Sequence, residues 1–171
     1  TENHPGLMLG IAFESLVKLL AFLAVGIFVT WFAFDGPQGL LQAALSDQRV
    51  LQTFAIDQIG SSFVTIFLLS TLAVFCLPRQ FHVTVVESTS PRDLRWARVL
   101  FPAYLVMIGL FIVPIAVAGM LSFDQVGDAD AFVLILPLEA GQGWLALIAL
   151  LGGVSAATGM VIVAAVALST M

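Results

Sequence analysis

The sequence predicts an all-α integral membrane protein with four transmembrane helices, and three observations lead to this class. Of the 171 residues, 60% are hydrophobic and only 10% are charged, whereas a soluble domain has roughly 45–50% apolar and about 25% charged residues. Four apolar stretches are long enough to cross a bilayer core of about 30 Å, which takes about 20 helical residues. None of them alternates polar with apolar residues, so the strands of a membrane barrel are excluded.

The predicted spans cover about residues 7–34, 60–77, 97–121 and 144–168. The first span is longer than an upright helix needs, so we expect it to tilt or to begin in the interface. The third span contains Pro102 and Pro114, and proline removes a backbone donor and favours a kink.

Two shorter elements are predicted between the spans. Residues 37–50 carry apolar side chains at helical spacing, which indicates a short surface helix. The apolar run 131–138 is too short to span, so we expect it to lie against the bundle or to dip into the interface.

The charges predict the orientation. The segment before the third span holds four of the six basic residues: Arg79, Arg92, Arg95 and Arg98. The positive-inside rule therefore places the loop 78–96 in the cytoplasm. The acidic loops 35–59 and 122–143 then face outward, and both chain ends face the cytoplasm. The apolar end and the missing initiator Met favour an internal fragment of a longer polytopic protein.

The composition also excludes function classes. A net charge of −5 without a basic stripe argues against nucleic-acid binding, and the few charges argue against a soluble enzyme. The sequence contains no metal-ligand cluster, phosphate loop or nucleophile–base pair, and Cys76 has no base nearby in sequence. We therefore expect no catalytic site, metal site or cofactor in this segment, and membrane lipid as one partner.

Glu14 and Lys18 are the first candidates for a solute or ion pathway. Their spacing of four places both side chains on one face of the first span. A charge at the bilayer centre costs about 3 kcal/mol or more, so pairing and a polar environment are expected. The alternative is a structural ion pair near the cytoplasmic interface, with Lys18 reaching toward the headgroups.

Gln80 and His82 form a second candidate group, at the cytoplasmic end of the second span. A histidine titrates near neutral pH and can gate proton movement. The alternative is an interfacial residue hydrogen-bonded to a helix end. The arginines before the third span most simply anchor it to anionic lipid.

The fourth span contains small residues at four-residue spacing. Gly152, Gly153, Ala156 and Gly159 allow another helix to approach closely, and packing is their simplest role. Ser155 and Thr158 add hydroxyl groups, which can coordinate a small hard cation. They are therefore further pathway candidates.

Three blocks of the sequence resemble the sodium/solute symporter family. These are HPGLMLGIAFESLVKL at residues 4–19, LPRQFHV at 77–83, and GGVSAATGMVIV at 152–163 together with the ending LSTM. The likeness is greatest to the branch in which a transporter-like module precedes a sensor histidine kinase. It implies part of a LeuT-type inverted-repeat fold in a bacterial inner membrane, with a small-molecule solute and attached cytoplasmic kinase domains as partners.

The resemblance has one departure, which concerns the coupling ion. The resemblance implies a thirteen-helix fold in which the four spans are roughly helices six to nine. Sodium-coupled members usually carry a Ser-Thr pair and a further hydroxyl in the ninth helix, where this sequence has Gly159, Met160 and Ile162. Sodium prefers hard oxygen ligands, and these three side chains offer none. The coupling ion, H⁺ or Na⁺, is therefore left open.

Three functions remain possible from the sequence. The first is a partial secondary-transporter module for a small organic solute, an amino acid among the candidates, coupled to sensing by the attached kinase. The second is a sensory input domain that does not transport. The third is a stand-alone four-helix membrane subunit whose polar residues serve packing.

Overall fold

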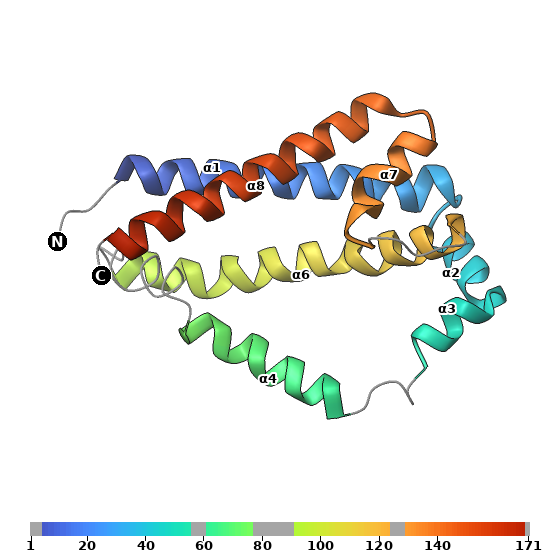
Figure 1. Cartoon of the computed structure of the whole chain (residues 1–171), viewed down its shortest axis with the longest axis horizontal. Coiled ribbons are helices and arrows are strands. Elements are labelled where there is room, and N and C mark those ends of the chain that lie inside the picture. The colour runs from blue at the N-terminus through green and yellow to red at the C-terminus, as the bar shows by residue number, and fades with distance from the viewer. Residues whose placement is uncertain (1–4, 56–60, 77–90, 124–128, 170–171) are drawn as a thin grey trace.

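Three long helices form the bundle of the protein (Figure 1). The computed structural model describes residues 5–55, 61–76, 91–123 and 129–169. The long helices are α1 (Pro5–Ile27), which continues as the π-helix η1 (Phe28–Ala33), α6 (Pro91–Ser122) and α8 (Gly143–Ser169). All three are long and apolar enough to cross a membrane. The prediction of an all-helical fold with long apolar helices is therefore confirmed for the described residues.

The second predicted span corresponds to α4 (Ser61–Cys76), which has 16 described residues. This is shorter than the about 20 residues that a bilayer core requires. Its side chains from Phe63 to Leu72 are all exposed, and Figure 1 shows α4 standing apart from the bundle. A fourth span therefore stays a prediction.

The third span begins earlier than the sequence suggested. We predicted a loop up to residue 96, but α6 is already helical from Pro91. Proline is favoured in the first turn of a helix, because its missing N–H has no partner there anyway. The helix also continues through Pro102 and Pro114.

The directions of the helices agree with alternation across a membrane. In Figure 1 the start of α1, the start of α6 and the end of α8 lie at the same end of the bundle. The arginine-rich segment before the third span therefore leads into the end of the bundle at which both termini lie. The cytoplasmic placement of this end stays a prediction from the charge distribution.

The contact between α1 and α8 depends on two glycines. A Cβ built on Gly152 would lie 2.7 Å from the Cβ of Ala21 and 3.6 Å from the Cα of Lys18. A Cβ on Gly159 would meet the carboxylate of Glu14. Both glycines therefore lie in the α1–α8 contact. A Cβ on Gly153, by contrast, would have nothing within 4 Å.

The buried core lies at the other end of the bundle. Val25 and Val29 of the first span pack there with Ala118 of α6 and Leu145 of α8. Phe132 joins them from α7 (Phe132–Glu139), which follows the short 3₁₀ helix η4 (Ala129–Ala131). The predicted apolar run 131–138 is thus a short helix lying against the bundle.

The first span ends in a tight turn. The N–H of Gly36 donates to the carbonyl of Thr30 at 2.8 Å, and the Thr30 hydroxyl donates to the carbonyl of Gly26 at 2.7 Å. Asp35 adopts φ 54° and Gly36 φ 102°. Aspartate tolerates this left-handed conformation better than most residues, and glycine has no Cβ to oppose it.

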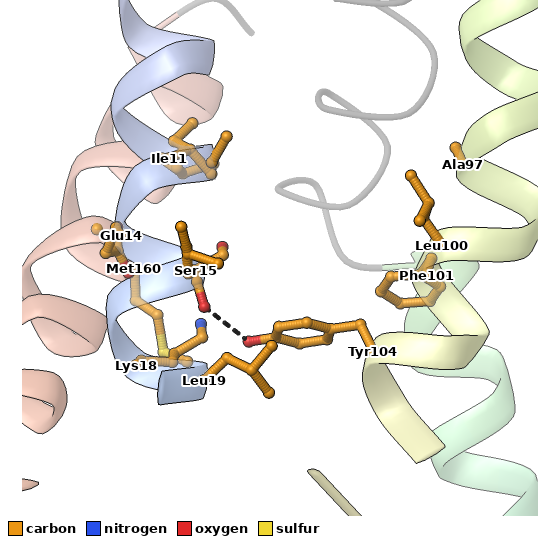
Figure 2. Close-up of a pocket in the computed structure, with 14 residues that line it drawn as sticks. Ile11, Glu14, Ser15, Lys18, Leu19, Ala97, Leu100, Phe101, Tyr104 and Met160 are labelled. Carbon is orange, nitrogen blue, oxygen red and sulfur yellow. Dashed lines mark hydrogen bonds between the residues drawn. The ribbon is translucent and has the colours of Figure 1, made fainter. Parts of the chain in front are cut away.

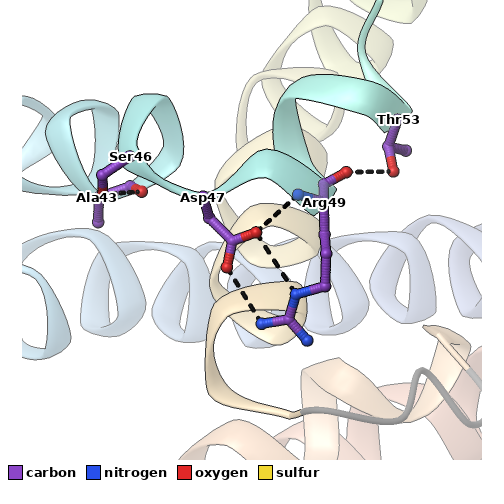
Figure 3. A network of polar contacts seen from close by, with 5 residues as sticks. All are labelled: Ala43, Ser46, Asp47, Arg49 and Thr53. Carbon is purple, nitrogen blue, oxygen red and sulfur yellow. Dashed lines mark hydrogen bonds and ion pairs between the residues drawn. The ribbon is translucent and has the colours of Figure 1, made fainter.

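The predicted surface helix at 37–50 is two helices, α2 (Pro37–Ser46) and α3 (Gln48–Thr53). The break is at Asp47, which has an extended backbone and whose carboxylate accepts the N–H of Arg49 at 2.8 Å. Figure 3 shows the same carboxylate paired with the Arg49 guanidinium, at 3.1 Å. This arrangement caps α3 and holds the pKa of Asp47 below its usual value, because both contacts favour the charged carboxylate.

Candidate solute and ion pathway

Glu14 and Lys18 line a pocket of about 530 Å³ between α1, α6 and α8. We call it the Glu14 pocket. Ile11, Ser15 and Leu19 of α1 contribute to one wall, and α6 and α8 form the others. The helical spacing that placed the two charged residues on one face of α1 therefore also turns that face toward the other two spans. The remaining lining residues are mainly apolar: Ala12, Leu16, Ala97, Leu100, Phe101, Tyr104, Gly159, Met160 and Val163.

The two charged side chains extend in different directions. The Glu14 carboxylate lies against the bare backbone of Gly159, since a Cβ there would collide with it. Figure 2 shows the Lys18 nitrogen on the side of the pocket nearer Tyr104, away from the Glu14 carboxylate. Among the described residues no ion pair joins Glu14 to Lys18. The expected Glu14–Lys18 ion pair is therefore not formed in this conformation.

An unpaired charge inside a span is costly unless water or a ligand satisfies it. Lys18 lies about 15 Å along the span that begins at Met8, by the rise of about 1.5 Å per residue. At such depths the cost is about 3 kcal/mol or more per charge. The pocket supplies the space for compensation, since it has room for several waters or a small solute.

Tyr104 is a member of the site that the sequence analysis missed. It is the protein's one tyrosine, and its hydroxyl donates to the carbonyl of Ser15 at 3.5 Å, which connects α6 to α1 (Figure 2). At this length the hydrogen bond is weak, so the hydroxyl can also serve a ligand. A phenol within an otherwise apolar span was the signal that could have identified it.

The hydroxyl candidates of α8 do not line the pocket. Thr158 is exposed, and its hydroxyl donates to the carbonyl of Val154 at 2.8 Å within the same helix. Ser155 also lies outside the lining of the Glu14 pocket. The α8 residues that do reach it are Gly159, Met160 and Val163, whose side chains carry no oxygen. Within the described ranges there is also no group of three or more His, Cys, Asp or Glu side chains that could hold a metal ion.

Gln80 and His82 fall outside the described residues, so their predicted role is not addressed by the structure. Ile162, the third residue of the sodium-site departure, is exposed on α8.

The arrangement can do two things chemically. An ammonium and a phenol facing one cavity can bind an anionic or hydrogen-bonding group of a solute. A carboxylate within the membrane can take up and release a proton. Comparison with protein-family models, with curated proteins and with solved structures found no match to this chain.

Proposed function

We propose that this chain is part of a secondary-transporter module and that a small organic solute occupies the Glu14 pocket. One observation carries the proposal. Two opposite charges, four residues apart within a membrane span, face a pocket between three spans without pairing with each other. If the two residues served packing alone, a direct ion pair would satisfy both charges at lower cost. Held apart, they remain available to a solute and a coupling ion.

The roles follow from where each group points. The Lys18 ammonium and the Tyr104 hydroxyl share the open side of the pocket, where they would hold a carboxylate or hydroxyl of the solute. Glu14 lies in the α1–α8 contact, so its charge acts on the packing of these helices. A proton on Glu14 would remove that charge and alter the contact. This supports proton coupling over sodium coupling, since the α8 side chains nearby offer no oxygen ligands.

The resemblance to the sodium/solute symporter family supports the wider proposal. On this basis we infer a LeuT-type inverted repeat, a fourth span at 60–77 and a bacterial inner membrane with both ends of this segment in the cytoplasm. The solute class would include amino acids. The kinase of the resembling branch would then report the conformation of the module.

Uptake by the full-length protein in proteoliposomes tests the proposal. A panel of radiolabelled amino acids is offered with a proton gradient and then with an uncoupler, each with and without sodium. We expect uptake that fails with the uncoupler and survives without sodium. Lys18→Gln should reduce uptake at least tenfold, because the charge that anchors the solute is lost.

Asp35→Asn is the matched control, because it removes an exposed carboxylate outside the span and asparagine tolerates the same backbone conformation. It should leave uptake unchanged. Folded, reconstituted protein that transports none of the panel, or that transports normally with both Glu14→Gln and Lys18→Gln in place, would contradict the proposal.

A further inference from the structure

A second pocket lies directly beside the Glu14 pocket, and the proposed function does not use it. It has a volume of about 570 Å³ and is lined by α1, α6, α8 and the η4–α7 segment. Lys18 borders both pockets. We call this second space the Asp130 pocket, defined by the lining residues Lys18, Phe22, Ile108, Asp130, Val133 and Ala157.

The Asp130 pocket lies at membrane depth. Its lining residues on α8 run from Ala149 to Ala157, which is about 9–21 Å from the start of that helix at Gly143. Figure 1 shows that α7 begins part-way along α6 and runs back toward the start of α8. Asp130, just before α7, is exposed and lines this pocket.

The described lining of this pocket includes one acidic side chain, Asp130, and one basic side chain, Lys18. Asp130 is the one carboxylate among the described lining residues; its side chain is exposed, and it makes no ion pair or hydrogen bond with another described residue. Lys18 lines this pocket as well as the Glu14 pocket, where Figure 2 shows its nitrogen on the Tyr104 side of α1. The ring of Phe22 supplies an aromatic wall. A carboxylate and an aromatic ring within an apolar cavity are the groups that recognise an ammonium ion.

We propose that the Asp130 pocket binds a small organic ammonium ion, with Asp130 as its counter-charge and Phe22 against its apolar part. A hard metal ion is a poorer fit, since calcium takes six to eight oxygen ligands and the pocket offers one carboxylate. An organic anion is disfavoured by the same carboxylate. The Lys18 ammonium, which lies between the two pockets, repels the cation and so opposes its passage into the Glu14 pocket.

Cysteine labelling of the full-length protein tests this site without any solute transport. In a Cys76→Ser background, Ala157→Cys places a thiol on the α8 wall of the pocket that Asp130 also lines. Its reaction is compared for a cationic trimethylammonium-ethyl thiosulfonate and an anionic sulfonatoethyl thiosulfonate. We expect the cationic reagent to react about tenfold faster, because the negative field of a carboxylate that lines the pocket raises the local concentration of cations. Tetramethylammonium at millimolar concentration should slow the reaction.

The variant Asp130→Asn keeps the size of the side chain and removes its charge. It should bring the rate ratio of the two reagents close to one and abolish protection by tetramethylammonium, whereas Asp130→Glu should retain both. Leu41→Cys, exposed on α2, is the surface control, and its rates should not respond to the change at residue 130.

Three results would overturn the proposal. These are equal rates for the two reagents, a cation preference that persists in Asp130→Asn, and a thiol at residue 157 that neither reagent reaches in folded protein. None of them depends on whether the Glu14 pocket transports a solute, so the two proposals can fail separately.

Discussion

Adding a methyl group at Gly152 should weaken the contact between α1 and α8, whereas the same change at Gly153 should not. The two glycines are neighbours in the same helix, so Gly→Ala brings the same intrinsic gain at both, up to about 1 kcal/mol. They differ in surroundings. The new Cβ at residue 152 would be 2.7 Å from the Cβ of Ala21, and at residue 153 nothing lies within 4 Å.

The expected loss of stability in Gly152→Ala follows from this geometry. The Cβ of Ala21 is fixed to its backbone, so the clash is relieved only if the helices move apart. Overpacking of this kind costs about 1–3 kcal/mol. Gly153→Ala should thus be neutral or stabilising by up to about 1 kcal/mol, and Gly152→Ala should be less stable than Gly153→Ala by about 1–3 kcal/mol.

Unfolding in mixed micelles with increasing SDS, followed by far-UV circular dichroism, measures this difference. The double variant Gly152→Ala/Ala21→Gly provides an internal check, because removing the opposing methyl group should recover most of the loss. Two results would refute the close α1–α8 approach at Gly152. One is equal stability of Gly152→Ala and Gly153→Ala. The other is a double variant whose loss of stability equals the summed losses of Gly152→Ala and Ala21→Gly.

Three further results are expected. Gly159→Ala meets only the movable carboxylate of Glu14, so we expect a stability change below about 1 kcal/mol but reduced solute uptake, measured in proteoliposomes. Tyr104→Phe removes a long hydrogen bond and should cost less than about 1 kcal/mol in the SDS titration, while uptake falls. Asp47 has a lowered pKa because of Arg49, so its contribution to α3 is present above its unfolded value of 3.8 and is lost as the pH falls through the lowered pKa. Amide exchange in α3 should therefore accelerate in acid, and Asp47→Asn should remove that pH dependence.

The sequence predicted much of the fold because the bilayer imposes a simple requirement. A helix must be long and apolar to cross a bilayer. The predicted spans 7–34, 97–121 and 144–168 each correspond to a long helix of the structure. The boundaries were less accurate where polar residues continue a helix, as in the residues from Pro91 onward. The break at Asp47 was also missed, since its capping hydrogen bond depends on backbone geometry that periodicity does not contain.

The candidate site was predicted only in part. The spacing of Glu14 and Lys18 identified the helix face that lines the pocket. Tyr104 and Asp130 were not identified, because they are far from α1 in sequence and reach the two pockets only through packing. Thr158 was a candidate because it has a hydroxyl, yet that hydroxyl bonds within its own helix.

The sequence by itself determined that this is a helical membrane protein, with two charges on one face of its first span. These properties are local, since they depend on hydropathy and on the period of a single helix. Only the tertiary structure decided that Gly152 and Gly159 face α1 while Gly153 does not, and that Glu14 and Lys18 remain apart. Those outcomes depend on how α8 is rotated and how closely it approaches, which the packing of whole helices sets.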